Sequence, residues 1–260
     1  MDADYRMRQH ATKTPPAREV LWERGRQVNH HHSDLIDTTE MYLRTIYELE
    51  EEGVTPLRAR IAERLSQSGP TVSQTVARME RDGLLQVESD RHLLLTERGR
   101  RLAVSVMRKH RIAERLLHDV IGLEWDQLHV EACRWEHVMS DAVERRIVAM
   151  LDGPLICPHG NPIPGLEGLG LSANGPSDAA VLPTLAASVT DDEVTVRIER
   201  ISELLQPNVE LMRQLSDSGM TPGLSVAVTR VPAGLHVAGA PDTELVLDEV
   251  ARHIFVSVPA

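Results

Sequence analysis

Residues 129–137, with the sequence HVEACRWEH, restrict most narrowly what this chain can fold into. At 3.6 residues per helical turn, His129, Cys133 and Glu136 lie on one stripe, with His137 at its edge. A stripe that packs into a hydrophobic core would carry Leu, Ile or Val instead. Two imidazoles, a thiol and a carboxylate are most of the ligands that a divalent transition metal takes. The segment therefore predicts a helix, expected over 125–137, whose polar face binds metal.

One isolated His or Cys is usually a core or surface residue and does not identify a ligand. Four potential ligands within nine residues favour metal binding. A second pair, His110 and Glu114, at i and i+4 on an earlier helical stretch, strengthens this interpretation. The chain has only two cysteines, Cys133 and Cys157, so it has no disulfide framework. With no run of eighteen apolar residues and no secretion signal, we expect a cytoplasmic protein without a membrane span.

A helix-turn-helix pattern precedes the ligand-rich segment. Short helices are expected over 41–49, 58–65 and 70–81, with a tight turn at 66–69 before the third, where proline fits the first position. Ser, Thr, Gln and Arg on the outer face of the third helix are typical of DNA recognition. Residues 84–95 then read as a hairpin, which completes a winged helix. An incidental three-helix bundle would share only the first half of this pattern.

The charge is distributed unevenly. The whole chain has a formal net charge of -11, which argues against indiscriminate coating of nucleic acid. Residues 54–111 nevertheless carry twelve basic and six acidic side chains, a net charge of +6, whereas residues 172–260 carry five and twelve, a net charge of -7. A basic segment inside an acidic chain is typical of a localised DNA-binding surface.

The remaining pattern predicts a mainly α-helical chain with a β domain at its C-terminus. A long helix follows Thr96, and a further helix over 141–151 adds more apolar surface than one small domain buries, which indicates a dimer interface. Glycine and proline are frequent over 153–178, where we expect a linker or ordered loop. Alternating strands are expected within the last third of the chain. Their ranges are 194–198, 225–228 and 255–258, with a helix over 209–215 between them.

The residues together resemble the diphtheria toxin repressor family, the iron-dependent repressors of Gram-positive bacteria. The resemblance is carried by the runs 37–47, 68–76, 107–111 and 131–140, and it is dense over 34–170. It implies three parts: a winged helix-turn-helix DNA-binding domain (34–104), a metal-binding and dimerisation domain (105–171) and an SH3-like small β-barrel (172–260). Residues 1–33 are polar and show no sustained apolar period, so we expect them to be a disordered N-terminal extension. The extension has no counterpart in the family.

The resemblance also implies two metal sites in each subunit. The first would consist of Met41, Cys133, Glu136 and His137. The second would consist of His110, Glu114, His129, Glu203 and Gln206. An anion pocket would use Arg111 and Asn161, and the serine usual in the family is Cys157 here. Thioether and thiolate ligands disfavour Mg²⁺ and Ca²⁺, so we expect Fe²⁺, for which Mn²⁺, Co²⁺, Ni²⁺ or Zn²⁺ can substitute.

The expected function is metal-dependent repression of transcription. Metal would order a homodimer that binds double-stranded DNA at inverted-repeat operators of iron-uptake and related genes, with one or two dimers on each operator. Gln74 is expected to read base edges, Ser68 and Pro70 to contact thymine methyls, and arginines to bind phosphates. The full set of expected DNA contacts is Thr38, Arg58, Ser68, Pro70, Thr71, Ser73, Gln74, Arg78, Arg81 and Arg91.

Four other functions are considered at this point, and one of them, a metal-buffering protein without DNA contact, is disfavoured by the recognition helix. A Mn²⁺-responsive repressor of manganese transport would use the same fold, and a winged-helix regulator with a purely structural metal would unfold when the metal is chelated. A metal-dependent hydrolase is disfavoured because the sequence has no glycine-rich phosphate loop and the ligands fill the sites without leaving an open position. We therefore expect a regulator and not an enzyme.

Overall fold

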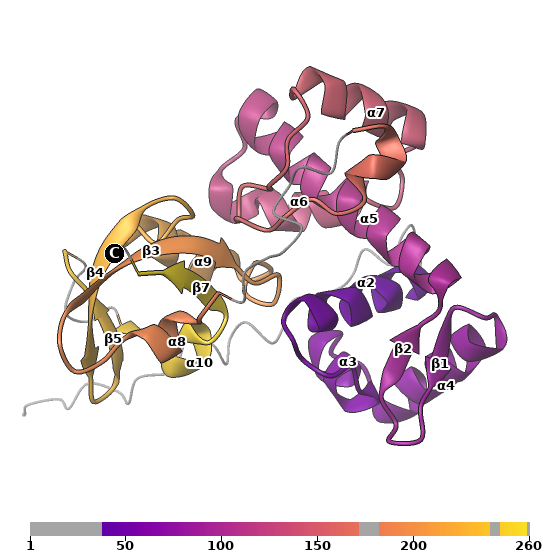
Figure 1. Cartoon of the computed structure of the whole chain (residues 1–260), viewed down its shortest axis with the longest axis horizontal. Coiled ribbons are helices and arrows are strands. Elements are labelled where there is room, and N and C mark those ends of the chain that lie inside the picture. Colours follow the sequence, from indigo (N-terminus) through magenta and orange to yellow (C-terminus); the bar gives the residue numbers. More distant parts are fainter. Residues whose placement is uncertain (1–37, 172–181, 240–244, 259–260) are drawn as a thin grey trace, which may run out of the picture.

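The described chain forms three hydrophobic cores that follow one another in the sequence. The computed structural model describes residues 38–171, 182–239 and 245–258, so the tail expected over 1–33 lies outside it. The first core extends from Tyr42 to Ala103, the second from Ile112 to Leu166 and the third from Leu185 to Val256. The three cores correspond to three lobes of the molecule (Figure 1).

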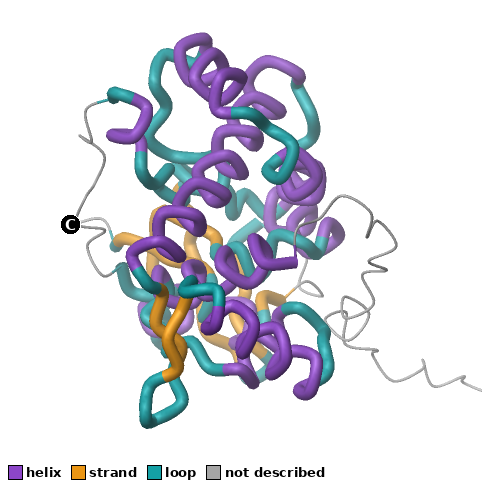
Figure 2. Tube along the Cα trace, turned by 90° about the vertical axis from the view of Figure 1, so that its right-hand side faces the viewer, coloured by secondary structure: helices purple, strands orange, loops and turns teal. Residues whose placement is uncertain are grey.

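The first lobe, called the head below, is the expected winged helix-turn-helix. Ser68 caps helix α4 by accepting a hydrogen bond from the Thr71 amide, and Pro70 takes the second position of the helix, one later than predicted. The two strands pair antiparallel, with Leu85 opposite Leu95, and the hairpin projects from the body in Figure 2. The elements are α2 (Thr38–Glu51), α3 (Arg58–Arg64), α4 (Gly69–Arg81), β1 (Leu85–Val87) and β2 (Leu93–Leu95).

Helix α5 (Glu97–Leu116) joins the head to the second lobe. It places Ala103 in the first core and Ile112 in the second, so the boundary expected between residues 104 and 105 falls inside one continuous helix. A π-helical turn (Leu117–Ile121) extends it, and Gly122 ends it with a left-handed φ of +75°. The remaining elements are a 3-10 turn (Trp125–Gln127), α6 (Leu128–Trp135), α7 (Asp141–Met150) and a 3-10 turn (Leu166–Leu169).

The ligand-bearing helix is shorter than predicted. The sequence predicts one helix over 125–137, but its first turn is 3-10 and α6 ends at Trp135, so Glu136 and His137 occupy the following turn. The amides of Val138 and Met139 both bond to the Trp135 carbonyl, which closes that turn. The chain must reverse here because Ser140 already caps α7.

The third lobe is built on a five-stranded antiparallel sheet with the order β6-β5-β4-β3-β7. Three strands and α9 were predicted, whereas β5 and β6 were not, because four and two residues are too short to establish an alternating pattern. The strands are β3 (Val194–Ile201), β4 (Ser225–Val231), β5 (Gly234–Val237), β6 (Leu245–Val246) and β7 (Ile254–Ser257). The helices are α8 (Leu185–Ser188), α9 (Val209–Asp217) and α10 (Asp248–Ala251).

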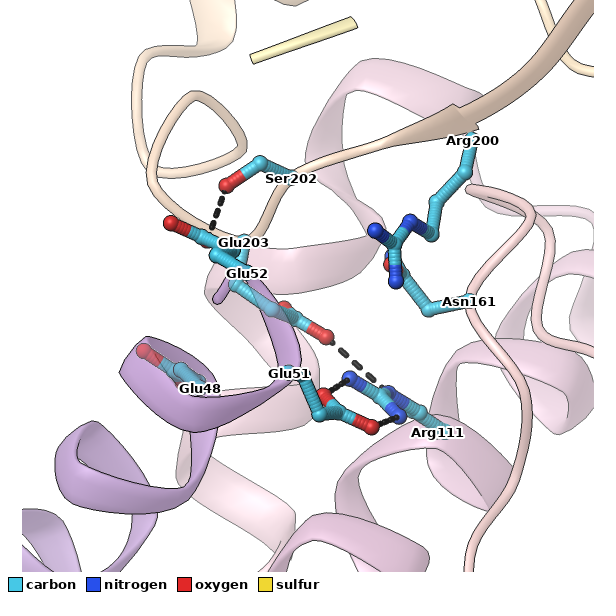
Figure 3. A pocket seen from close by; sticks show the side chains of 8 residues that line it. All are labelled: Glu48, Glu51, Glu52, Arg111, Asn161, Arg200, Ser202 and Glu203. Carbon is cyan, nitrogen blue, oxygen red and sulfur yellow. Dashed lines mark hydrogen bonds and ion pairs between the residues drawn. The ribbon is translucent and has the colours of Figure 1, made fainter. Parts of the chain in front are cut away.

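The three lobes meet at a small polar cavity, called the junction below (Figure 3). Arg111 of α5 donates to both carboxylate oxygens of Glu51 in α2, at 3.0 and 2.6 Å, and to Glu203 of the third lobe at 3.1 Å. Ser202 of the third lobe donates to Glu52, which directly follows α2. Side chains far apart in the sequence therefore hold the head against both other lobes. No helix within the described ranges is long and apolar enough to cross a membrane.

Gly99 makes the packing between α5 and the head unusually close. A Cβ atom added there would lie 1.9 Å from the carbonyl oxygen of Leu84, which is backbone and cannot rotate away. We expect Gly99→Ala to lower the free energy of unfolding by about 1–3 kcal/mol, measured by urea denaturation. Gly69→Ala is the control, since a Cβ there meets no atom within 4 Å. Equal stability of the two variants would contradict this packing.

Candidate metal centre and DNA-reading surface

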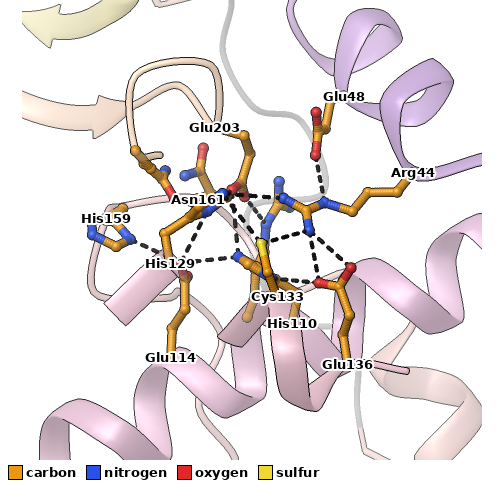
Figure 4. A network of polar contacts seen from close by, with 12 residues as sticks. Arg44, Glu48, His110, Glu114, His129, Cys133, Glu136, His159, Asn161 and Glu203 are labelled. Carbon is orange, nitrogen blue, oxygen red and sulfur yellow. Dashed lines mark hydrogen bonds and ion pairs between the residues drawn. The ribbon is translucent and has the colours of Figure 1, made fainter. Parts of the chain in front are cut away.

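Five buried polar residues of α5, α6 and the turn after β3 gather in what we call the inner cluster: His110, Glu114, His129, Glu203 and Gln206. Figure 4 labels the first four of them. One ligand atom from each of the first four lies within 4.8 Å of the others. His110 Nε2 is 3.1 Å from Glu114 Oε1, and His129 Nδ1 is 3.0 Å from Gln206 Oε1. The structure thus brings together the five residues expected in the second metal site.

Two carboxylate oxygens of the inner cluster are buried without a hydrogen-bond partner in the described structure, namely Glu114 Oε2 and Glu203 Oε2. Glu203 Oε2 lies 3.2 Å from His129 Nδ1, although not with hydrogen-bond geometry. A buried oxygen with negative charge is costly unless a donor or a cation compensates it. Two imidazoles, two carboxylates and an amide oxygen are also ligands that divalent transition metals accept. The residues present therefore fit a metal ion.

Cys133, Glu136 and His137 form a second group beside the first, the outer cluster. His137 Nε2 is 3.2 Å from Glu136 Oε1, but Cys133 Sγ lies closer to the inner cluster, 3.4 Å from His129 Nε2. Glu136 also bonds to His110 Nδ1 at 2.6 Å, so the two groups are continuous. Met41, the fourth residue expected here, is half-buried on α2, and its carbonyl accepts from Thr45 Oγ1. Among the described residues, the outer ligands thus do not form one compact group of ligand atoms as the inner ligands do.

The head reaches into the outer cluster through two residues of α2 that the sequence did not single out. Arg44 Nη1 donates to Cys133 Sγ at 3.2 Å and to both oxygens of Glu136 at 2.9 and 2.8 Å. Glu40 Oε2 lies 2.6 Å from His137 Nδ1. Both contacts cross from the head to the turn after α6. The ligand-rich segment is therefore bonded directly to the first described helix of the head.

The electrostatics of the outer cluster keep its ligands ionised. Burial raises the pKa of the Cys133 thiol, but the charges of Arg44 and then His129 lower it to well below its usual value. Burial likewise raises the pKa of Glu136, and Arg44 with His110 brings it down to about 2. Burial lowers the pKa of His129, whereas Cys133 raises it to about 9. The cluster is thus a half-buried thiolate and a buried carboxylate neutralised by nearby cations.

A further buried histidine, His159, lies beside the inner cluster and was missed by the sequence reasoning. Its Nδ1 is 3.0 Å from Glu114 Oε1, its Nε2 is 3.3 Å from the Trp125 carbonyl, and its ring packs on the indole of Trp125. With Cys157 and Glu114 it forms another compact group of potential ligands. The residue sits in a loop, where no helical spacing marks it as facing the cluster.

The expected anion pocket is occupied by protein groups in this structure. The Arg111 guanidinium is fully buried and donates to Glu51, Glu203 and the Pro162 carbonyl. Asn161 donates its amide to the Ile201 carbonyl at 2.9 Å. Both residues line the junction, but Arg111 faces carboxylates there.

The residues expected to contact DNA lie on the head. Nine of the ten are exposed, and Arg58, at the start of α3, is half-buried. Thr38 begins α2, and Arg91 lies in the loop of the hairpin with a φ of +72°. The other seven lie on α4 or at its cap: Ser68, Pro70, Thr71, Ser73, Gln74, Arg78 and Arg81. One helix therefore presents most of the expected surface to solvent.

Comparison with known proteins agrees with this arrangement. Residues 34–93 match the family described as "Iron dependent repressor, N-terminal DNA binding domain", and residues 96–165 match "Iron dependent repressor, metal binding and dimerisation domain". The iron-dependent repressor IdeR of Mycobacterium tuberculosis is 60% identical over 202 residues, 78% of this chain and 88% of that protein. The diphtheria toxin repressor of Corynebacterium diphtheriae is 57% identical over 223 residues, 85% of this chain and 97% of that protein.

Solved structures with the same fold include manganese regulators. A manganese-dependent transcriptional repressor in complex with manganese has a TM-score of 0.69 at 28% identity, covering 85% of this chain and all of that one. The manganese regulator SloR has a TM-score of 0.67 at 27% identity, covering 86% and 100%. The winged helix, the metal-ligand clusters and these similarities agree, and the chain belongs to the iron-dependent repressor family of DNA-binding transcription regulators.

Proposed function

We propose that the chain is an Fe²⁺-dependent repressor in which two metal ions per subunit, one at each cluster, hold the head in the orientation that binds DNA. The observation that carries the proposal is the position of the clusters. Their residues come from α5, the α6 region and the third lobe, and α2 of the head contacts the outer cluster through Arg44 and Glu40. A metal bound there would act on the contacts between α2 and the α6 region, which hold the head in its orientation.

Metal would act by shifting an equilibrium between orientations of the head. Moving a two-state population from 1:99 to 99:1 needs about 5.5 kcal/mol of differential affinity. Ligand bonds from Cys133, Glu136 and His137, with Met41 from the head, are of sufficient strength, since structural metal sites contribute more than this. The Cys133 thiolate and the Glu136 carboxylate are negatively charged, and a bound metal ion would help to compensate that charge.

Fe²⁺ is the proposed metal because of the ligand types. The Cys133 thiolate and Met41 thioether are soft ligands, which disfavour Mg²⁺ and Ca²⁺. Co²⁺, Ni²⁺ and Zn²⁺ are expected to substitute in vitro. Mn²⁺ is the second candidate, favoured by the similarity to the two manganese-responsive regulators. A sulfur ligand fits Mn²⁺ less well than Fe²⁺, which favours Fe²⁺.

The DNA partner follows from the head and from a dimer. Two recognition helices related by a two-fold axis bind an inverted repeat, and we propose operators of iron-uptake and related genes as the targets. An exposed apolar face on the second lobe supports the dimer. It comprises a groove lined by Ala142, Val143, Arg146, Ile147 and Met150 of α7, where the side chains of Val143 and Met150 are about half exposed in the single chain.

Removal of metal should release the DNA. We expect the Fe²⁺-loaded protein, kept anaerobic, to bind an iron-gene promoter fragment in fluorescence anisotropy, and a chelator to abolish binding while the far-UV circular dichroism stays helical. Titration with Mn²⁺ in parallel decides between the two metals. Binding that persists after complete removal of divalent metal would overturn the proposal. Unfolding on chelation would instead identify a structural metal.

Two substitutions on α4 should separate base reading from phosphate binding. We expect Gln74→Ala to reduce the preference for operator over random DNA, with a loss of about 1–3 kcal/mol on the operator. Arg81→Ala should weaken both DNAs equally and reduce the salt dependence of binding, because it removes one phosphate contact. Anisotropy titrations at several salt concentrations measure both effects. Equal losses on the two DNAs for Gln74→Ala would refute its role in base reading.

A charge on the apolar face of α7 should break the dimer. In a two-fold interface each substituted residue occurs twice, so Val143→Asp buries two carboxylates and should shift the protein to a monomer in sedimentation velocity. Leu224→Asp is the control, because Leu224 is also about half exposed but lies in the third lobe. If the Val143→Asp variant stayed dimeric and the Leu224→Asp variant became monomeric, the assignment of the interface to α7 would be wrong and the interface would lie in the third lobe.

A further inference from the structure

Arg44 places one guanidinium on atoms of both metal-ligand clusters (Figure 4). Its Nη1 bonds to Cys133 Sγ and to both oxygens of Glu136, and its Nη2 lies 3.5 Å from His129 Nε2. The side chain is about nine-tenths buried. One cationic group thus contacts three proposed metal ligands, Cys133, Glu136 and His129.

We propose that Arg44 is an internal competitor of the metal at the outer cluster, an inference that rests on the proposed function. A divalent ion bound by Cys133 and Glu136 would use the thiolate and carboxylate lone pairs that now accept from Arg44. It would also repel a guanidinium held within a few ångströms in a buried site. The ion and the Arg44 head group therefore exclude one another from these atoms.

The structure provides a second partner for the guanidinium when it leaves. Arg44 Nε already donates to Glu48 Oε1 at 2.6 Å, one turn further along α2 and on the side away from Cys133. Glu48 is buried, so its carboxylate can keep the displaced charge compensated. Glu48 also accepts from Arg64 Nη1 at 3.4 Å, so the displaced guanidinium would share this carboxylate with Arg64.

The exchange changes which bonds hold α2 against the α6 region. With Arg44 in place, the head is joined to Glu136 by hydrogen bonds from a long flexible side chain. With metal in place, those bonds are lost, and Met41, one turn earlier on the same face of α2, supplies the connection instead. The affinity for metal is then set partly by the strength of the Arg44 contacts, and the arginine tunes the metal concentration at which the head is reoriented.

The test measures metal affinity and not DNA binding. In the full chain, Co²⁺ is titrated against a competing chelator, and the thiolate-to-Co²⁺ charge-transfer absorption reports the outer cluster. We expect Arg44→Gln to lower the dissociation constant for Co²⁺ by about tenfold or more, because a repelling positive charge is removed. Arg44→Lys keeps the charge but has a single terminal nitrogen in place of the Nε that bonds Glu48 and the Nη1 that bonds Glu136, so it should give a smaller change in the same direction.

Arg100→Gln is the matched control. Arg100 also forms an ion pair with α2, through Glu50 at 2.8 Å, but it touches neither cluster, so its loss should leave the Co²⁺ affinity unchanged. Unchanged or weaker Co²⁺ binding by a folded Arg44→Gln variant would overturn the proposal and make Arg44 a purely structural contact. If Arg44→Gln does not fold, unchanged or weaker binding by Arg44→Lys overturns it equally. Metal-independent DNA binding by the unsubstituted chain would refute the proposed function, whereas the Co²⁺ affinities test Arg44 separately.

Discussion

Buried negative charge between α2, α5 and α6 is the constraint on which the rest of the structure depends. Glu114, Glu136 and Glu203 are nearly inaccessible to water, and the Cys133 thiol is held as a thiolate beside them. Such groups are tolerated in a protein interior only when a cation or several donors face them. In this chain the compensating charges come from arginines and histidines of different lobes. The contacts that neutralise the cluster are therefore also contacts that hold the lobes together.

Much of the fold and the inner cluster could be predicted from the sequence because local periodicity encodes them. The helices of the head, the hairpin and α5 follow from apolar spacing, capping residues and Gly83 and Gly122 at helix ends. The spacing of His110 with Glu114, and of His129 with Cys133, places each pair on one helical face. Glu203 and Gln206 could be assigned only through the family resemblance, since nothing in their own neighbourhood relates them to α6.

The rest depended on contacts between distant segments, which spacing does not encode. Arg44 looks like an ordinary charged residue of an amphipathic helix, and only the docking of α2 against α6 turns it toward Cys133. His159 lies in a loop, where side-chain direction has no period. The end of α6 was misplaced because Glu136 and His137 still favour helix locally, while the cap at Ser140 requires the chain to turn.

The contacts of Glu52 with Ser202, and of Arg111 with Glu203, span 150 and 92 residues. A ribosome makes the head long before it makes the strand that precedes Ser202, so the head can pack its own core before its contact with the third lobe is possible. The bonds that Arg44, Glu40 and Glu51 make with the second lobe can form before the third lobe exists, whereas the bond from Ser202 to Glu52 forms only after the strand before Ser202 has been made.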